Sequence, residues 1–446
     1  MLSYSGIPVV QMDNNSYKSG DSPGYCCSIA DNCVICRNNR NKRVDTMRKV
    51  LIWDISFRDA NVGGPSGYLY NIREYIHANP NEQIAFLSDL LKQNVKNGLP
   101  PSKPETIKDK LKKSRLFSRI NDLLFIVWKE YHVCSVQLPS SVNLDDYDFV
   151  HFHQANDVRR YASLLQGTHC KTILTTHSPC PRTDEILASR PWYYRIFAPW
   201  IRWQERMCYE QADYLMFPCK EAREPYEKDK RIRATFHAME HKFFYCPTAI
   251  REMPSQGRNI QHLSDIGIPS DAFVIAYFGR HSSIKGYDVL KQVGDKLLDK
   301  YPNLYFLCAG RGELSPLSHP RWIELGFIDN TSDLLPQCDL YILPNRETYF
   351  DLIVLEVLRA AVPLILSDNG GNRYFKSLPS SERSGMTFFD LKATELLCRM
   401  VEQKIQYKLT AAEKYKEDGA ANNLLWQHYF TMPTYVHNYL EQIGQI

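Results

Sequence analysis

The feature that most constrains the fold is a repeated pattern in which a short apolar run, sized for a buried strand, is followed by a segment with helical spacing. Such alternation is typical of parallel sheets with helices on both faces. A first series of expected strands lies at residues 50–56, 149–153, 171–177 and 214–218. A second series lies at 273–278, 304–310, 340–344 and 363–368. The sequence therefore predicts an α/β protein with two Rossmann-like, doubly wound parallel sheets.

Changes in this pattern suggest domain boundaries, and a chain of 446 residues is expected to form two to three domains. We expect a leader at 1–46, a first domain at 47–250, a second domain at 251–420, and carboxyl-terminal helices at 421–446. The linker between the domains is expected in the irregular stretch near residues 246–270.

The first 46 residues are polar, rich in Asn, Ser and Gly, and show neither strand nor helix periodicity. A segment with so few apolar residues cannot bury enough surface to offset its ordering entropy, so we expect a flexible leader. A zinc site is the less favoured interpretation, because only one pair of its cysteines has the C-x-x-C spacing and the other pair is adjacent. These residues are Cys26, Cys27, Cys33 and Cys36. Met47 begins the domain-like sequence and is an alternative start of translation.

Composition narrows the class of protein. The chain is 44% hydrophobic and 23% charged, as in an ordinary globular protein. Its net charge of +4 is small for a nucleic-acid binder, so we expect no nucleic-acid partner. The 13 cysteines are an odd number and mostly stand singly in apolar segments, which indicates reduced thiols and a cytoplasmic protein. We find no signal peptide and no apolar run near the roughly 18 residues that span a bilayer.

The most informative motif is AYFGRHSSIKG at residues 276–286, where an expected strand runs into a glycine turn. Gly279 lets the chain turn so that Arg280 and Lys285 leave the carboxyl end of the strand together. Arginine offers a planar fork to phosphate oxygens and lysine a point charge. Because ligands of open α/β sheets bind at such strand ends, the motif predicts a contact with a diphosphate rather than solvated surface charges.

A second motif, NRETYFDLIVLEVLRAAVPLILSDNGGN at residues 345–372, places an acidic pair at the start of an apolar helix, followed by a strand and a Gly-Gly loop. Together the two motifs resemble the nucleotide-sugar half of the retaining GT-B glycosyltransferases, of the family 4-like, "glycosyl transferases group 1" type. That broad family includes many bacterial polysaccharide and lipopolysaccharide transferases. The resemblance covers roughly residue 47 to the carboxyl end and is most specific at 276–372.

The resemblance implies two domains that face each other across a cleft, an acceptor-binding first domain, a nucleotide-sugar-binding second domain and terminal helices that return to the first. It assigns Arg280 and Lys285 to the donor diphosphate, and Glu356 to the donor ribose. It also implies donor contacts from the loop residues Asn369, Gly370 and Gly371.

The acidic pair departs from the family pattern. The family separates its two glutamates by seven residues, whereas Glu347 and Glu356 have eight between them, so strict spacing places Thr348 in the first position. Asp351 replaces the usual glycine. It is a good N-cap, but a carboxylate there repels a diphosphate if it points inward. We assign Glu347 a catalytic role and Thr348 a donor contact, and leave open which of Glu347, Thr348 and Asp351 meets the hexose.

The first domain holds further candidates. Gly63 and Gly64 follow a strand and open a helix, so their N–H groups are expected to cradle a donor phosphate. Their loop is not G-x-G-x-x-G, which argues against a dinucleotide-binding dehydrogenase. His177 ends an expected strand, where the resemblance implies contact with the transferred sugar. We interpret His151 and His153 as facing opposite sides of their strand, so that at most one lines the cleft.

Asp146 and Asp148 match the D-x-D metal motif of another glycosyltransferase class, but they precede a strand, and we interpret them as a solvated turn. We therefore expect no bound metal, and no cofactor other than a nucleotide-sugar donor acting as co-substrate.

Two stretches combine basic and aromatic residues, KDKLKKSRLFSRINDLLFIVWK at 108–129 and RPWYYRIFAPWIRW at 190–203. Such composition suits a helix at a membrane interface, although an ordinary helix that packs its apolar stripe on the core is the alternative. Contact with the inner face of the cell membrane thus stays open.

Taken together, the residues and the resemblance predict a metal-independent glycosyltransferase that moves a sugar, with retention, from a nucleotide-diphosphate donor to a glycan or lipid-linked glycan. The alternatives are a sugar-nucleotide epimerase or hydrolase on the same fold, and a catalytically silent sugar-nucleotide-binding subunit.

Overall fold

The computed structural model describes residues 47–57, 64–94, 115–126, 138–140, 142–228, 230–252, 262–328 and 331–446. The leader at 1–46 with its four cysteines, Gly63, and residues 108–114 and 127–129 of the first basic-aromatic stretch lie outside the described residues.

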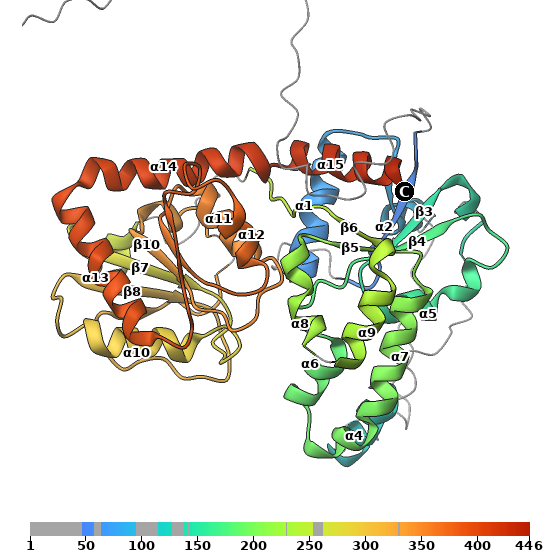
Figure 1. The fold of residues 1–446 in the computed structure, drawn as a ribbon, viewed down its shortest axis with the longest axis horizontal. Coiled ribbons are helices and arrows are strands. Elements are labelled where there is room, and N and C mark those ends of the chain that lie inside the picture. The colour runs from blue at the N-terminus through green and yellow to red at the C-terminus, as the bar shows by residue number, and fades with distance from the viewer. Residues whose placement is uncertain are drawn as a thin grey trace, which may run out of the picture. The chain divides into compact units, whose positions relative to one another are not determined.

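The first sheet consists of six parallel strands in the order β2-β1-β3-β4-β5-β6 (Figure 1). They are β1 (Val50–Trp53), β2 (Ile84–Phe86), β3 (Phe149–Phe152), β4 (Lys171–Leu174), β5 (Tyr214–Phe217) and β6 (Phe243–Tyr245). The order changes direction between β1 and β3, where Val50 pairs with Phe149. Loops that leave a parallel sheet at such a switch point diverge and open a crevice for ligands.

The second sheet also has six parallel strands, in the order β12-β11-β10-β7-β8-β9. They are β7 (Phe273–Phe278), β8 (Leu304–Ala309), β9 (Trp322–Glu324), β10 (Leu340–Leu343), β11 (Leu364–Ser367) and β12 (Met386–Phe389). Counted from β7, this is the 3-2-1-4-5-6 order of a Rossmann fold, with its switch point between β7 and β10. The predicted pair of doubly wound parallel sheets is therefore confirmed.

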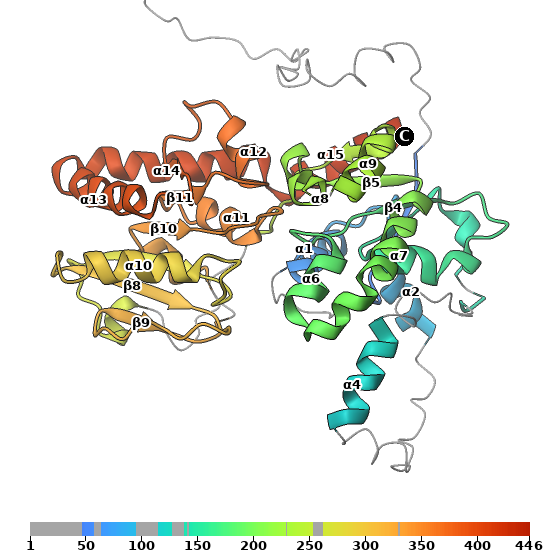
Figure 2. The same cartoon turned by 60° about the horizontal axis from the view of Figure 1, so that its bottom comes forward.

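Helices cover both sheets (Figures 1 and 2). Those that precede the second sheet are α1 (Gly64–Ala78), α2 (Leu87–Asn94), α4 (Arg115–Leu124), α5 (Ala155–Arg160), α6 (Arg182–Ser189), α7 (Ala198–Gln211), α8 (Glu224–Glu227) and α9 (Lys230–Ala238). The later ones are α10 (Tyr287–Leu297), α11 (Leu352–Arg359), α12 (Asn372–Ser377), α13 (Thr394–Thr410), α14 (Ala412–Tyr429) and α15 (Met432–Gln445).

The core explains why the central strands are continuous apolar runs. All six residues of β7 are buried, as are all four of β10 and of β11, because helices cover both faces of a parallel sheet. The edge strands β2, β6, β9 and β12 were not predicted. Strands β2, β6 and β9 have only three residues each, and a run that short carries little periodicity. Strand β12 has four residues, as do most of the strands that were predicted, so its length does not explain why it was missed.

The carboxyl-terminal helices connect the two sheets. Helix α15 follows α14 and packs its tyrosines into the core of the first sheet, where it lies beside α1 (Figure 1). The Tyr439 hydroxyl is 2.7 Å from Nδ1 of His151 on β3. At the junction of α14 and α15, Thr431 forms a parallel bridge with Ile250, which lies in the segment leaving β6.

All eight cysteines among the described residues are free thiols, and six of them are buried. In the same part of the chain, no helix has the length and apolar character that a bilayer crossing requires.

Candidate active site

The switch point of the second sheet brings two loops together. The loop after β7 holds Arg280 and Lys285, and the loop after β10 holds residues 345–351. The Arg346 amide donates to the Ile284 carbonyl at 2.8 Å. Gly286 has a φ of 67°, and a Cβ there would lie 1.8 Å from the Pro344 carbonyl oxygen, so only glycine allows this approach of the loops.

The two cations predicted to bind diphosphate differ in their surroundings. Arg280 is exposed, and within the described part of the chain its guanidinium has no ion pair. The Lys285 ammonium lies 2.6 Å from Oδ1 of Asp351. The second oxygen of Asp351 accepts a hydrogen bond of 2.7 Å from Nδ2 of Asn345. The carboxylate that departs from the family pattern thus points at the predicted phosphate lysine.

A third cation at this edge, Arg346, is also paired. Its two terminal nitrogens each lie 2.6 Å from an oxygen of Asp288, the first-turn residue of α10. The hydrogen bonds from Arg346 lower the pKa of Asp288, although partial burial opposes them. A bidentate pair of this kind holds the two loops in fixed register.

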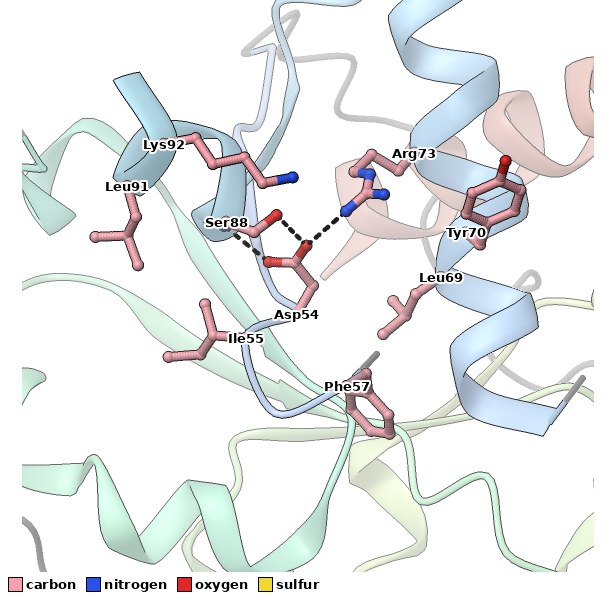
Figure 3. A pocket seen from close by; sticks show the side chains of 9 residues that line it. All are labelled: Asp54, Ile55, Phe57, Leu69, Tyr70, Arg73, Ser88, Leu91 and Lys92. Atoms are coloured by element: carbon pink, nitrogen blue, oxygen red, sulfur yellow. Dashed lines mark hydrogen bonds and ion pairs between the residues drawn. The ribbon is translucent and has the colours of Figure 1, made fainter. Parts of the chain in front are cut away.

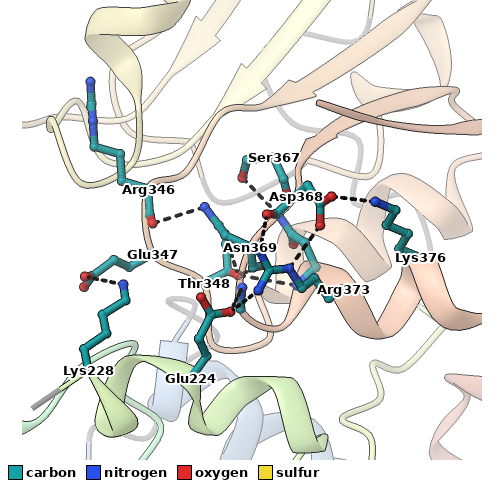
Figure 4. Close-up of polar contacts among 12 residues, drawn as sticks. Glu224, Lys228, Arg346, Glu347, Thr348, Ser367, Asp368, Asn369, Arg373 and Lys376 are labelled. Carbon is teal, nitrogen blue, oxygen red and sulfur yellow. Dashed lines mark hydrogen bonds and ion pairs between the residues drawn. The ribbon is translucent and has the colours of Figure 1, made fainter. Parts of the chain in front are cut away.

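The Gly-Gly loop after β11 packs on the loop after β10 (Figure 4). Thr348 is buried, and its hydroxyl donates to the Asn369 carbonyl at 2.9 Å. Gly370 has a φ of 41°, and a Cβ on Gly371 would lie 1.8 Å from the Tyr349 carbonyl oxygen. In the structure, these residues join two loops at the carboxyl edge of the sheet.

Charged residues of α8 reach these loops from the first-sheet side (Figure 4). Oε2 of Glu224 accepts hydrogen bonds from the Gly370 amide at 2.9 Å and from Arg373 at 2.8 Å. Lys228, the residue directly after α8, lies 3.1 Å from Oε1 of Glu347. The sequence analysis did not identify Glu224 and Lys228, because each contact spans more than a hundred residues of chain.

Glu356, the predicted ribose ligand, lies in the second turn of α11. Its Oε2 accepts a hydrogen bond from the Thr331 hydroxyl. Burial raises the pKa of Glu356, whereas the Thr331 hydrogen bond and the nearby Arg359 oppose that rise. The carboxylate is thus partly buried and already has one hydrogen-bond donor.

His177 lies three residues beyond β4, with a φ of 53° that is unusual for a non-glycine residue. Its Nε2 is 2.8 Å from Nδ1 of His153, and its ring centroid lies 4.6 Å from that of Tyr68 on α1, with the two rings tilted by 55°. Burial lowers the pKa of His177 to about 3, so the ring is neutral near pH 7. It offers a hydrogen bond rather than a charge. Its backbone strain fits a functional position.

The interpretation of His151 and His153 as facing opposite sides of the strand is wrong. Their ring centroids are 4.1 Å apart, because residues two positions apart on a strand point to the same side. Burial lowers the pKa of both rings well below the ordinary histidine range, with further lowering from neighbouring histidines. His151 and His153 are buried and His177 is partly buried, and their adjacent rings form a row that we term the histidine row.

A cavity of about 270 Å³ lies at the carboxyl end of β1 (Figure 3). Asp54 lies in its wall, where Ser88 donates from its amide at 2.9 Å and from its hydroxyl at 2.5 Å. Arg73 of α1 lies 3.7 Å from the same carboxylate. Gly64, the predicted phosphate-loop residue, is the first residue of α1 and has a φ of 55°.

The D-x-D residues lie at the opposite edge of the first sheet, just before β3. Asp148 accepts hydrogen bonds from Arg48 and from the Lys49 amide, and Asp146 accepts one from Asn143. Within the described ranges, no three side chains of metal-binding type gather to hold an ion.

The basic-aromatic stretch at 190–203 has two faces. Tyr194, Ala198 and Ile201 are buried in the core, as the ordinary-helix alternative expects. On the other face, large apolar side chains are exposed along a 3₁₀ helix, Trp192–Phe197, and the start of α7. We term this face the tryptophan stripe: Trp192, Ile196, Trp200 and Trp203, which are 73%, 67%, 47% and 38% exposed.

Two doubly wound parallel sheets whose functional loops lie at their carboxyl edges define an α/β protein of the GT-B fold class. Residues 272–390 match the family model described as "Glycosyl transferases group 1". A D-inositol 3-phosphate glycosyltransferase from Saccharomonospora viridis is 31% identical over 126 residues, which make up 24% of this chain and 29% of that relative. The similarity to this curated relative thus spans less than a third of its length.

Solved structures confirm the GT-B fold. Sucrose-phosphate synthase from Thermosynechococcus elongatus superposes with a TM-score of 0.56 at 15% identity, covering 89% of this chain and 98% of that one. The Anabaena protein HepE, solved in complex with UDP and glucose, gives a TM-score of 0.54 at 12% identity, covering 90% and 100%.

Proposed function

We propose that this protein is a retaining glycosyltransferase that moves a sugar from a nucleoside-diphosphate sugar to a glycan or lipid-linked glycan. The observation that carries the proposal is the placement of Arg280 and Lys285 beside the switch point of the second sheet, inside the segment that matches the glycosyl transferases group 1 family. HepE, which shares the fold, was solved with UDP and glucose.

In this reaction the donor diphosphate lies against Arg280 and Lys285, which stabilise the negative charge that develops as the nucleoside diphosphate leaves. The acceptor hydroxyl attacks the sugar on the face from which the leaving group departs, so the anomeric configuration is retained. The acceptor enters from the first-sheet side, where the cavity beside Asp54 opens.

The polar groups on the two sides of the sugar have separate roles. Neutral His177, held by His153, provides a hydrogen bond to a sugar hydroxyl without adding charge. Glu347, whose carboxylate is held by Lys228, faces the reacting sugar from the second-sheet side. Glu356 accepts hydrogen bonds from the donor ribose when the Thr331 hydroxyl turns away.

The test is a screen of UDP-, GDP- and ADP-sugars for nucleotide release, with and without a lipid-glycan extract. Release that requires the extract supports transfer. Release without an acceptor contradicts transfer and supports the epimerase or hydrolase alternative, and binding without release supports a silent subunit. The Arg280→Ala/Lys285→Ala double variant serves as the inactive control.

We further propose that the tryptophan stripe holds the enzyme at the inner face of an anionic membrane, near a lipid-linked acceptor. Tryptophan is favoured where one end of the ring meets apolar groups and the other meets water. Arg195 is exposed beside the stripe and complements anionic headgroups, whereas Arg190, which is also exposed, pairs with Asp122 at 3.0 Å.

Sedimentation with phosphatidylglycerol vesicles tests this contact. The Trp192→Ser/Trp200→Ser variant is expected to lose most vesicle binding while keeping its melting temperature, because both side chains are exposed. A matched control is Leu409→Ser/Leu424→Ser, which removes two apolar side chains that are 75% and 64% exposed on α13 and α14. Equal sedimentation of both variants, or none by the wild type, contradicts the proposal.

A further inference from the structure

Asp351 has an unusual position for a residue at the start of a helix. It is the N-cap of α11, yet its side chain accepts no capping hydrogen bond from that helix. Instead its two oxygens face Lys285 at 2.6 Å and Asn345 at 2.7 Å. An N-cap aspartate ordinarily accepts from the first-turn amides. The sequence analysis anticipated the cap, but the carboxylate is used at the switch point of the sheet.

The surroundings of Asp351 correspond to those of a phosphate oxygen. A lysine ammonium and an amide N–H bind its two oxygens at the carboxyl ends of β7 and β10, where α/β sheets bind ligands. Asn345 is fully buried, and its own side-chain oxygen has no hydrogen-bond partner among the described residues. The Asp351 carboxylate thus pairs with Lys285, the cation that the proposed function assigns to the donor diphosphate.

We propose that Asp351 sets the affinity for the nucleoside diphosphate by occupying Lys285 until the diphosphate displaces it. This inference rests on the proposed function and deepens it. Binding then requires Lys285 to exchange one anion for another, and release of the nucleoside diphosphate product is favoured by the return of the carboxylate.

The geometry allows this exchange. The Lys285 and Asp351 side chains are 26% and 19% exposed, so a ligand can reach the pair from solvent. A lysine has a flexible four-carbon stem and no fixed fork, so it changes partner by rotation of its own side chain. By contrast, Arg346 is bound bidentately to Asp288. This pair holds the loop after β10 against α10, so Arg346 is not expected to bind phosphate.

The experiment measures binding of UDP, GDP and ADP to the full chain by titration calorimetry. Asp351→Asn keeps the shape and the N-cap preference of the residue but removes its charge. We expect the dissociation constant of the preferred nucleoside diphosphate to fall by about tenfold, because a like charge and a competing ion pair are lost. The matching nucleoside, which has no phosphate, is expected to bind both proteins equally.

Two further variants isolate the cause. In a Lys285→Ala background, Asp351→Asn is expected to have a much smaller effect, since the competition passes through that lysine. Glu402→Gln is the matched control, because it removes a carboxylate on α13 that lies 2.6 Å from the ammonium of Lys300, in the turn after α10. This control is expected to leave nucleotide affinity unchanged.

The outcomes separate the two proposals. If the wild type binds a nucleoside diphosphate and Asp351→Asn binds it equally or more weakly, the role of Asp351 is overturned and the proposed function stands. If neither protein binds any of the three nucleotides, the proposed function fails and this inference fails with it. Should Asp351→Asn have a lower melting temperature, Asp351→Ser, another good N-cap, replaces it in the same comparison.

Discussion

The two sheets end in opposite ways at their carboxyl edges. The first sheet ends in the histidine row, whose rings are neutral, buried or partly buried, and hydrogen-bonded to other uncharged groups. The second ends in charged pairs, Lys285 with Asp351 and Arg346 with Asp288, that are partly open to solvent. A buried neutral group can position a substrate without attracting ions, whereas a solvent-accessible pair can exchange its partner for a charged ligand. Under the proposed function, we therefore expect sugar contacts at the first edge and charge balance at the second.

The largest expected effect is a loss of unfolding free energy in acid, and it tests the histidine row at the first edge. The folded-state pKa of each histidine in the row lies below that of the unfolded chain, so the unfolded chain binds more protons as the pH falls below about 6.5. The stability contributed by these rings is complete above that pH and is lost as the pH falls through each folded-state pKa, which for His177 is about 3. We expect each ring to remove about 1.4 kcal/mol of unfolding free energy per pH unit in this window.

Urea unfolding at pH 7 and at pH 5.5 measures this loss. His153→Gln removes one titrating ring, so the dependence on pH should flatten even if the variant is less stable at both values. His428→Gln, at an exposed position on α14, is the control. If the change of unfolding free energy with pH is the same in His153→Gln as in the wild type, the histidine row does not have the lowered pKa values described above.

The second prediction tests the other edge. Replacing Arg280 or Lys285 with Ala is expected to weaken nucleoside diphosphate binding and turnover by about tenfold or more, since a hydrogen bond to a charged group contributes roughly 1.5 to 3 kcal/mol. Calorimetry and nucleotide-release assays measure both quantities. Wild-type affinity and rate in the two variants would remove the basis for a phosphate site at this switch point.

A smaller effect is expected where the two edges meet. Glu224→Gln weakens the contacts with Arg373 and the Gly370 amide, and both charged side chains are more than a third exposed. We therefore expect a loss of less than about 1 kcal/mol in unfolding free energy. Glu413→Gln, at an exposed site on α14, is the control for removing one carboxylate. A loss several times larger means that the cross-sheet contact is a main determinant of stability.

The smallest expected effect is none. Once a donor is found, activity should survive EDTA, because Arg280 and Lys285 can balance the leaving diphosphate in place of a divalent ion. Turnover is measured after chelation and again after adding magnesium or manganese. Restoration by either metal would contradict the prediction and return attention to Asp146 and Asp148.

How much could be predicted depended on the distance over which each signal acts. The alternation of apolar runs and helical spacing is local, and it predicted both sheets, whereas edge strands such as β2 were too short to show a pattern. Lys285 was predicted to bind phosphate because it lies in the loop directly after β7, so the strand and the cation appear in one short stretch of sequence. Lys228 could not be linked to Glu347, because their contact exists only after residues 119 positions apart fold together. The position of Asp351 was identified, but its pairing with Lys285 depends on the packing of two loops.

The chain passes between the two sheets twice, and the two passages are joined side by side. The Ile250 amide donates to the Phe430 carbonyl at 3.2 Å, next to the bridge between Ile250 and Thr431. Two backbone segments that are hydrogen-bonded to each other at this place restrain the two halves here more than elsewhere. If the side-chain contacts of Glu224 and Lys228 are broken, we therefore expect the halves to rotate about this junction, with the largest displacement at the loops farthest from it.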